Sequence, residues 1–429
     1  MLQFLCKVLQ SRTTTFGQAK AEGEIIQDIE VYPSKNILVC GNGIYTYKDT
    51  SELDELVNTL GGGDLHAIDN SKSSPKQYSN FHFRDIFGRY HRFFRPYTRT
   101  LAPLKVRVFT DAYCYSDSSE ILITKSKKAL ISQTSYITHE FAMPRGLTTL
   151  RRALFVLKQI YKWLKFFIAK THNIHGTVAV MHQARHYGHY LVESVSSMLQ
   201  ILESKVEIDY YILDISTPFA KAMVELLQIP TDKILSPTPH RLMHADRIVL
   251  STLTADVELL EYRDHILWSH ALSLPLNILD FYTRLAYDAT SSHSSRKVFL
   301  KRPENSNRNF ENPQEVEAIF AEYGYEIILP DTLSLLEQIT LMQEAKVIAS
   351  MHGAGLVNVL FAPSDAVVFE IFSQYYYDAA LQMCALLKHQ KYLYMVGETH
   401  DTSMHPQQES VYIEPQKLRQ ALSIVEQHV

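Results

Sequence analysis

The chain has 429 residues, a length that predicts two or three domains because single hydrophobic cores seldom grow so large. Hydrophobic residues make up 46% of the sequence and charged residues 21%, which is the balance of a globular protein. The 42 basic and 46 acidic residues give a net charge of −4, which argues against a nucleic-acid partner. The 4 cysteines form no CxxC pair, so neither a disulfide framework nor a thiolate zinc site is expected.

The sequence carries no recognisable signal for export or for crossing a membrane. The apolar run at residues 1–7 is too short for a signal peptide, and no apolar run reaches the ~18 residues of a membrane span. There is also no N-x-Ser/Thr site for glycosylation. We therefore expect a cytoplasmic protein, either free or peripheral on the inner face of the cell membrane.

Residues 1–150 are expected to form an N-terminal region of mixed α+β structure. Short β-like runs lie within 25–47 and 121–138. Between them, residues 78–100 interleave aromatic side chains with arginines. A solvated face with some buried rings explains this pattern better than a surface for anionic lipid or an acidic acceptor.

Residues 151–170 have the pattern of an amphipathic helix. Apolar residues recur at helical spacing, and Lys158, Lys162 and Lys165 line another face beside aromatic residues. An interfacial helix on an anionic membrane surface needs these two faces. A helix packed on the protein's own core shows nearly the same pattern, so both interpretations stay open.

The rest of 151–290 is predicted to be a Rossmann-like domain. Apolar strands at 210–213 and 247–251 alternate with helices at 188–203 and 218–228. This βαβ alternation is typical of a parallel sheet. A polar linker at 290–295 then marks a boundary.

A second Rossmann-like domain is predicted over 291–400, followed by a C-terminal tail or helix over 401–429. Asn312 with Glu315, and Ser334 with Glu337, have the spacing of capping boxes at two helix starts. The predicted order is strand 297–301, helix 313–323, strand 325–329, helix 335–345, strand 347–351, helix 356–361 and strand 366–371.

The loop between strand 347–351 and the next helix is a candidate phosphate site. Gly353 and Gly355 let the backbone turn tightly and bring N–H groups close to an anion, and the helix start adds unpaired donors. His352 has a hydrogen-bond donor for a phosphate oxygen, and Ala354 and Asn358 complete the candidate set. A βα turn whose glycines serve packing alone remains the simpler explanation of this short motif.

Other motifs fit less well. A complete GxGxxG is absent, since Gly41-Asn42-Gly43 lacks the third glycine. His-Gly-x-Gly also occurs in esterase oxyanion holes, but the chain has no GxSxG elbow. His139-Glu140 lacks the second histidine of a zinc protease.

His189 and Glu193 are the candidate catalytic pair. They lie four residues apart on the predicted helix, on a polar stripe shared with Ser196 and Gln200. A hydroxyl nucleophile needs a base near neutral pH, and either residue suits, with the glutamate also able to orient the imidazole. On spacing alone, a simple surface His–Glu pair is the better explanation.

Three more charged residues are candidates for binding the diphosphate and the ribose of a nucleotide. Arg302 closes strand 297–301 at the edge where open α/β folds bind ligands, and Arg308 follows in the next loop. Both cations suit a diphosphate, although ordinary loop charges explain them equally well. Glu370 is an acid inside an apolar strand, and we expect it to accept hydrogen bonds from ribose hydroxyls.

Over 185–395 the sequence resembles glycosyltransferase family 61. The resemblance rests on these runs: Tyr187-Gly188-His189-Tyr190-Leu191-Val192-Glu193, Lys297-Val298-Phe299-Leu300-Lys301-Arg302, Asn312-Pro313-Gln314-Glu315, residues 335–345, His352-Gly353-Ala354-Gly355-Leu356-Val357-Asn358-Val359-Leu360-Phe361-Ala362-Pro363 and Val367-Val368-Phe369-Glu370-Ile371. The long HGAGL-x-N-x-x-F-x-P run is the specific part, whereas the histidine helix alone is not.

The resemblance implies an α/β fold of GT-B type, in which two Rossmann-like domains face a cleft, with the acceptor domain at 151–290 and the donor domain at 291–400. It implies an inverting transfer of a sugar, without an obligatory metal or other cofactor, from a nucleotide-sugar such as a UDP-sugar to a hydroxyl of a glycan or lipid-linked acceptor. Bacterial relatives work in capsule or lipopolysaccharide assembly.

This sequence departs from the family pattern in two places. The arginine-rich stretch after the first strand of the donor domain has only Arg302 and Arg308, which leaves open which of them faces phosphate. Ser196-Ser197 stand near the place of the usual proline-arginine pair after Glu193. A non-catalytic nucleotide-sugar-binding or assembly protein of the same fold remains the alternative. Sugar, acceptor and linkage are not fixed by the sequence.

Overall fold

The computed structural model describes residues 13–14, 16–40, 43–59, 85–89, 97–115, 118–125, 129–131, 171–181, 186–238, 241–252, 258–262, 265–269, 276–287, 295–304 and 306–429. By internal contacts the chain divides into two compact units: unit 1 is Met1–Pro33 with Pro103–Asp256, and unit 2 is Ser34–Ala102 with Val257–Val429. Each unit combines residues from more than one of the ranges 1–150, 151–290, 291–400 and 401–429. These ranges stay a prediction, since the units are defined by contact alone.

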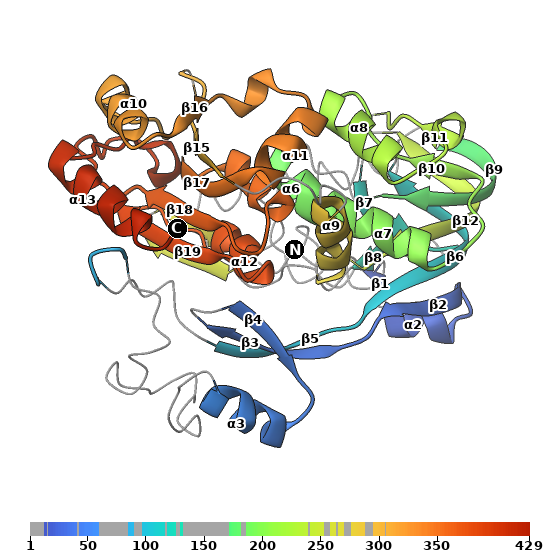
Figure 1. Ribbon diagram of the computed structural model, residues 1–429. Helices are drawn as coiled ribbons and strands as arrows, with labels where there is room; N and C mark the ends of the chain where they lie inside the picture. The colour runs from blue at the N-terminus through green and yellow to red at the C-terminus, as the bar shows by residue number, and fades with distance from the viewer. Residues whose placement is uncertain are drawn as a thin grey trace, which may run out of the picture. The chain divides into compact units, whose positions relative to one another are not determined.

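Unit 1 is built on a mixed sheet of 9 strands in the order β1-β8-β7-β6-β12-β9-β10-β11, with β2 also paired to β6. Figure 1 labels these elements. Their bounds are β1 (Thr13–Thr14), β2 (Ile25–Tyr32), β6 (Leu104–Tyr115), β7 (Ser118–Ile123), β8 (Ala129–Ile131), β9 (Thr171–Val180), β10 (Tyr210–Ile212), β11 (Ile234–Leu235) and β12 (Leu242–Ser251).

The parallel sheet predicted from the βαβ alternation makes up only part of this mixed sheet. Strands β9, β10, β11 and β12 pair in parallel, whereas β6 runs antiparallel to β12. The prediction was therefore incomplete, because an apolar run identifies a strand but not its neighbour. The chain goes from β9 to β10 and β11, then returns to β12 on the other side of β9. Such a reversal is where open α/β sheets bind ligands, at the carboxyl ends of the strands.

The helix predicted at 188–203 follows β9 and consists of three pieces. These are α6 (Tyr187–His189), the π-helical turn η2 (Tyr190–Ser194) and α7 (Val195–Glu203). The predicted helix at 218–228 is α8 (Pro218–Leu226), which starts with the Thr217 side chain accepting a hydrogen bond from the Ala220 amide. Helix α7 packs on β12, one of the two strands that flank the switch point, and on β6.

Unit 2 includes a small sheet in the order β4-β3-β5 and a separate hairpin. Its small core is Leu38 packed against Tyr45, Tyr47, Leu53 and Leu56. The bounds are β3 (Lys35–Cys40), β4 (Gly43–Tyr47), α3 (Thr50–Thr59), β5 (Tyr97–Leu101), and the hairpin β13 (Glu258–Tyr262) and β14 (His265–Ser269).

The main sheet of unit 2 has 5 parallel strands in the order β16-β15-β17-β18-β19. The chain moves outward from β15 to β16 and then crosses to β17, so the switch point lies between β15 and β17. The strands are β15 (Arg296–Leu300), β16 (Glu326–Ile328), β17 (Ala345–Met351), β18 (Val367–Phe372) and β19 (Lys391–Val396). The region is thus an α/β structure with a parallel sheet, which is consistent with the predicted Rossmann-like domain.

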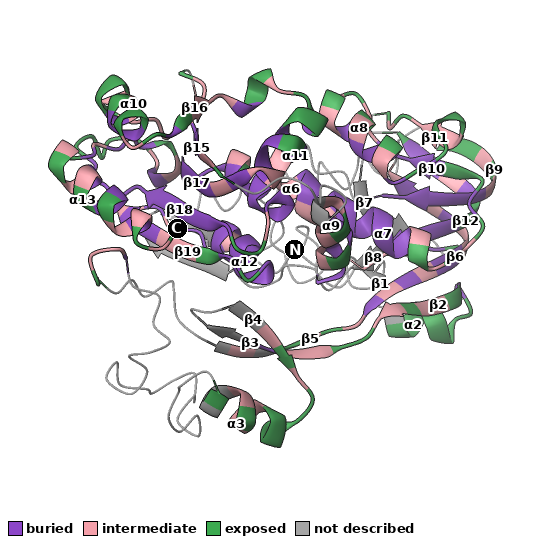
Figure 2. Cartoon of the chain, in the orientation of Figure 1, coloured by how far each residue is buried: buried purple, intermediate pink, exposed green. Residues whose placement is uncertain are grey.

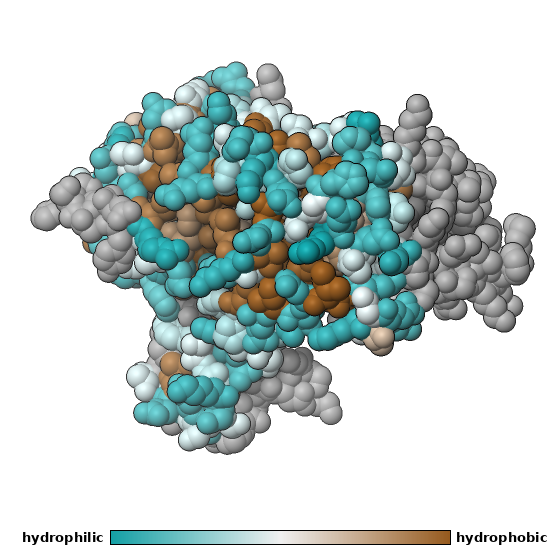
Figure 3. Space-filling view, turned by 90° about the vertical axis from the view of Figure 1, so that its right-hand side faces the viewer, coloured by the Kyte–Doolittle hydropathy of each residue, from teal (hydrophilic) through white to brown (hydrophobic). Residues whose placement is uncertain are grey.

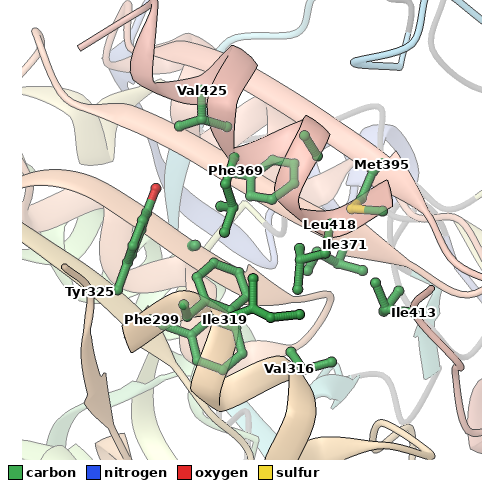
Figure 4. Close-up of a cluster of buried hydrophobic side chains, with 14 of the residues drawn as sticks. Phe299, Val316, Ile319, Tyr325, Phe369, Ile371, Met395, Ile413, Leu418 and Val425 are labelled. Carbon is green, nitrogen blue, oxygen red and sulfur yellow. The ribbon is translucent and has the colours of Figure 1, made fainter. Parts of the chain in front are cut away.

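Helices cover both faces of this sheet (Figure 1). One face packs on α10 (Pro313–Glu322) and α13 (Pro415–Glu426), through a core in which Phe299 stacks on Phe320 and Phe369 lies near Val425 (Figure 4). The other side carries α9 (Asn277–Tyr287), α11 (Leu335–Gln343), α12 (Ala380–Leu387) and the 3₁₀-helix η5 (Ala354–Phe361). Strands β17 and β18 are therefore buried on both faces, as Figure 2 shows, which explains their continuous apolar sequence.

The two predicted capping boxes have different outcomes. Ser334 and Glu337 form the box at the start of α11, each side chain binding the other residue's backbone N–H. At α10 the prediction was wrong. The Asn312 amide accepts from the Ile413 N–H and donates to the Ile413 carbonyl, so a distant segment takes the side chain that the helix start needs.

No helix within the described parts of the chain is long and apolar enough to cross a membrane. The membrane contact predicted through 151–170 falls outside the described residues, as does most of 78–100. Figure 3 faces the side of Figure 1 where β9, β10 and β12 are labelled, and hydrophobic side chains gather there among hydrophilic ones. The exposed large hydrophobic residues described in unit 1 are Ile26 and Tyr210.

Candidate donor and acceptor sites

The predicted donor residues of unit 2 gather at the switch point of its parallel sheet. Arg302 and Arg308 follow β15, and His352 with Gly353 follows β17, so they come from the carboxyl ends of adjacent strands. The Arg302 Nη1 lies 3.4 Å from the His352 carbonyl oxygen, to which it donates a hydrogen bond. The sequence separates these groups by a helix–strand–helix crossover, and the fold brings them together.

His352 is held by a buried carboxylate. Its Nδ1 lies 2.6 Å from Oε1 of Glu370, which is 0% exposed on β18. The other carboxylate oxygen, Oε2, accepts a hydrogen bond of 2.5 Å from the Tyr392 hydroxyl on β19. Burial, followed by the Glu370 charge, raises the pKa of Tyr392 well above 10.0, so its hydroxyl stays a donor. Because Nδ1 faces Glu370, the ring nitrogen that points away from the carboxylate is Nε2.

Two aromatic rings fix the plane of the imidazole. Phe372 stacks on the His352 ring at a centroid distance of 5.1 Å, and Tyr376 meets it edge-on at 5.3 Å. Both lie at the carboxyl end of β18 or just after it, where Ser373 and Tyr376 pair through an isolated β-bridge. The ring is therefore held by packing as well as by Glu370.

Arg302 lies across the backbone of the loop. Besides the His352 carbonyl, its guanidinium reaches the Ser306 hydroxyl from Nε at 3.3 Å. Burial, together with the positive charge of Arg308, lowers the pKa of Arg302 to about 10, and the Asp331 carboxylate partly offsets this. Two cations near one another in a half-buried site repel, and a bound anion would relieve that repulsion.

The two glycines of the loop have unequal roles. A Cβ on Gly353 would lie 1.8 Å from the Arg302 Nη1, whereas a Cβ on Gly355 would meet only Pro330 at an ordinary 3.7 Å. Neither glycine has a left-handed backbone, and the φ of 170° at Gly353 is an extended conformation that any residue adopts. Gly353 is therefore required for the close approach of a guanidinium, and the tight turn predicted for both glycines does not demand Gly355.

Arg308 has donors without acceptors. Its Nε and Nη1 are buried and lack a hydrogen-bond partner within the described structure. Its guanidinium carbon lies 5.0 Å from the centroid of the Tyr376 ring, in a cation–π contact. The backbone of Arg308 has a φ of 61°, a left-handed conformation that costs a bulky residue on the order of 1 kcal/mol. Strain of this kind is concentrated at ligand sites.

The side chains of Asn358 and Glu370 are buried and bind other groups of the protein. The Asn358 amide donates to Oε1 of Gln338 on α11 at 2.7 Å, and its side chain is buried within η5. Glu370 uses both oxygens on His352 and Tyr392, as described above. These contacts give Asn358 a packing role and Glu370 a role in orienting His352. The contacts to donor and ribose predicted for them stay predictions.

The predicted catalytic pair is formed in unit 1. His189 and Glu193 lie on either side of the boundary between α6 and η2, and Nδ1 of His189 lies 2.7 Å from Oε1 of Glu193. The glutamate side chain is 12% exposed and the histidine side chain 36%, so the imidazole is the outer member of the pair. π-Turns of this kind are frequent at functional sites.

The rest of the predicted polar stripe is buried. Ser196 and Gln200 are each 1% exposed, and the Gln200 amide binds the Thr252 backbone and the Ser196 hydroxyl. Apart from His189 and Glu193, the stripe is therefore buried and is not a solvated face. The buried part of the stripe holds α7 against the end of β12, the second strand of the switch point. His189 and Glu193 lie where the stripe reaches the surface.

Among the described residues, no cluster of three His, Cys, Asp or Glu side chains that could hold a metal ion is found. Cys114 and Cys384 are buried in the core and form no disulfide. In the cluster that follows β15 and β17, the groups that could hold an anionic ligand are the nitrogen donors of Arg302, Arg308 and His352.

Residues 177–369 match the family described as glycosyltransferase 61. They form a glycosyltransferase family 61 domain. No curated protein matches the chain. The domain includes the histidine helix of unit 1 and both arginines and the His352 loop of unit 2, and it ends one residue before Glu370. The resemblance read from the sequence is thereby confirmed, with a start slightly earlier and an end earlier than 185–395.

A domain of this family implies sugar transfer by an enzyme, with a sugar donor and an acceptor as ligands. Sequence reasoning missed two residues of the donor cluster, Tyr376 and Tyr392. Tyr376 lies in the run Tyr375-Tyr376-Tyr377 just after β18, at the edge where ligands bind, and that position was a usable signal. Tyr392 offered none, because a tyrosine on a strand usually serves packing.

Proposed function

We propose that this enzyme is an inverting glycosyltransferase of GT-B type that uses a nucleotide-sugar, in line with the UDP-sugars of its family. The observation that carries the proposal is the cluster of Arg302, Arg308 and His352 at the switch point of a parallel sheet. Such edges bind nucleotides, and this one carries positive charge where a diphosphate would lie. That the domain contains residues of both units favours the two-domain GT-B architecture.

On the donor side, the cluster would stabilise the departing nucleoside diphosphate. Charge that develops on the leaving oxygen is best stabilised by donors that are already in place. The buried Glu370 and the stacked Phe372 hold His352 in one orientation, and Arg302 holds the loop. We propose that the cluster of Arg302, Arg308 and His352 neutralises the leaving group, so that the reaction does not depend on a metal ion.

On the acceptor side, we propose that His189 is the base and Glu193 its orienting partner. The glutamate is the more buried of the two, and its carboxylate faces Nδ1, which leaves Nε2 on the opposite side of the ring. A carboxylate in this position fixes the tautomer and stabilises the imidazolium. The acceptor oxygen would attack the anomeric carbon, its proton would pass to His189, and the bond from that carbon to the diphosphate oxygen would break.

The setting follows from the family resemblance: a glycan or lipid-linked acceptor in the synthesis of cell-surface polysaccharide, capsule or lipopolysaccharide, on the cytoplasmic side of the membrane. The donor can be identified with a thermal-shift panel of UDP-, GDP-, CMP- and ADP-sugars, since a ligand that binds the folded state raises the melting temperature. We expect one nucleotide class to stand out, and His352→Ala to lose that shift and the release of nucleoside diphosphate. Full release by the variant would contradict the proposed donor site.

A non-catalytic nucleotide-sugar-binding protein is the second candidate function. It shares the donor cluster but has no use for the His189–Glu193 pair. The enzyme should hydrolyse its donor slowly without acceptor, whereas a binding protein should not. Donor hydrolysis measured for wild type and His189→Ala therefore separates the two.

A further inference from the structure

The two arginines of the donor cluster are bonded differently. Arg302 has acceptors for Nη1 and Nε, in the His352 carbonyl and the Ser306 hydroxyl. The Arg308 Nε and Nη1 are buried and have no acceptor among the described residues. Buried donors in folded proteins are nearly always satisfied, so the missing acceptor of Arg308 belongs to a ligand or to water.

Charge favours an anion over water. Arg308 lies close enough to Arg302 to contribute to the lowering of its pKa. A water molecule would supply an acceptor but would leave this repulsion in place, whereas a diphosphate would supply acceptors and remove it. The position agrees, because both arginines follow β15 at the switch point.

The side chain that holds Arg308 is Tyr376. The ring carries the guanidinium 5.0 Å from its centroid and touches His352 at 5.3 Å, so one aromatic residue contacts both a cation and the imidazole of the donor cluster. Tyr376 is itself anchored, being 6% exposed, with its hydroxyl accepting a hydrogen bond from the Gln407 amide. Without the contact to the Tyr376 ring, the side chain of Arg308, whose backbone is left-handed, could adopt many rotamers.

We propose that Arg308 is the arginine that binds the donor diphosphate, and that Tyr376 is the positioning residue that holds it there. Arg302 instead fixes the His352 loop by lying across Gly353. The inference rests on the proposed function and adds to it which of the two arginines binds the diphosphate, a question that the sequence left open. It predicts that removing the ring of Tyr376 weakens diphosphate binding through Arg308 alone.

The test uses the full chain, with inorganic pyrophosphate and UDP as probes in isothermal titration calorimetry. Arg308→Ala and Tyr376→Leu should each weaken binding of both probes about tenfold, the size of a partly desolvated cation–π contact or a charge-assisted bond. The double variant should bind no more weakly than Arg308→Ala. Tyr376→Phe keeps the ring face but loses the hydroxyl that interacts with Arg308 and Gln407, so its affinity should lie between those of wild type and Tyr376→Leu. Turnover should follow the same pattern, with KM for the donor rising more than kcat falls.

Matched controls separate positioning from stability. Tyr325 is also a buried tyrosine with a cation, Lys297, over its ring, but both lie at the amino end of the sheet. Tyr325→Leu should lower the melting temperature and leave the affinity for pyrophosphate unchanged. If Tyr376→Leu does not fold, Tyr376→Met keeps a similar apolar volume without a ring face and replaces it.

The outcomes distinguish this inference from the proposed function. Wild-type affinity in Arg308→Ala would overturn the assignment of Arg308. If UDP binding then also survived in His352→Ala, the proposed donor site would fail with it. A loss in Arg308→Ala with wild-type binding in a folded Tyr376→Leu, or losses that simply add in the double variant, would overturn the role of Tyr376 and leave the donor site standing.

Discussion

Nδ1 of His352 lies 2.6 Å from Oε1 of Glu370; His352 directly follows β17, and Glu370 lies within the neighbouring strand β18, where it pairs with Ser350. The carboxylate is fully buried, and its second oxygen is taken by the Tyr392 hydroxyl. A buried charge is costly unless it is paired and hydrogen-bonded, which this one is. The pair therefore fixes the loop histidine in place from behind the donor cluster.

This arrangement makes a prediction about Glu370. Glu370→Gln should lower the free energy of unfolding by about 1–3 kcal/mol, because a charged hydrogen-bond acceptor in the core is replaced by a neutral one. It should weaken UDP and 2′-deoxy-UDP by the same factor, since both carboxylate oxygens are already used by His352 and Tyr392. Calorimetry with both nucleotides measures this. A loss of discrimination between them in the variant would restore the ribose contact expected from the sequence.

The glycines of the loop are predicted to respond differently to substitution. Gly353→Ala should displace the Arg302 guanidinium from the His352 carbonyl, because its Cβ would lie 1.8 Å from Nη1. We expect donor affinity to fall about tenfold with a small change in melting temperature, since the displaced group is the end of a flexible side chain. Gly355→Ala, where the nearest atom is at 3.7 Å, is the matched control and should keep wild-type affinity. Equal effects of the two substitutions would show that crowding by Arg302 is not what requires Gly353.

His189 and Glu193 are predicted to contribute unequally to kcat. His189→Ala should lower kcat by about 10²–10⁴-fold, the range of general base catalysis, with little change in donor KM. Glu193→Gln should have a smaller effect, since the base remains and only its orientation suffers. His175→Ala is the control, because His175 also lies beside a carboxylate of unit 1, Asp246, but is 93% exposed. If Glu193→Gln proves the more severe variant, the glutamate is the base.

Lys388 is predicted to limit stability near neutral pH. It is 4% exposed at the C-terminal end of α12, and burial lowers its pKa from 10.5 to about 8. Between these values the folded protein has released a proton that the unfolded chain still binds, so stability should rise with pH over that window. Lys388→Met should raise the free energy of unfolding at pH 7 by up to roughly 3 kcal/mol and flatten this rise.

Urea unfolding at pH 7, 8, 9 and 10 measures this effect. The exposed Lys221 on α8 provides the control substitution, Lys221→Met, which should leave both stability and its pH dependence unchanged. An identical pH dependence in wild type and Lys388→Met would show that Lys388 is not the titrating group.

The sequence by itself determined the local features of this protein. The strand–loop–helix run around 352–355, the capping box of Ser334 and the histidine helix were predicted with nearly correct bounds. Each depends on residues a few positions apart, whose spacing is visible in the chain. The family resemblance was also readable, because the HGAGL run is continuous.

Only the tertiary structure decided which of these residues meet. The antiparallel β6 beside β12, the Asn312 contact with Ile413 and the Arg308 contact with Tyr376 all join segments that are distant in the chain. A hydrophobic pattern shows that a face is buried but not what covers it, and a charged residue does not reveal its partner. Burial and pairing in three dimensions therefore assigned Glu370 to His352 and showed that two buried donors of Arg308 lack an acceptor among the residues that the structure describes.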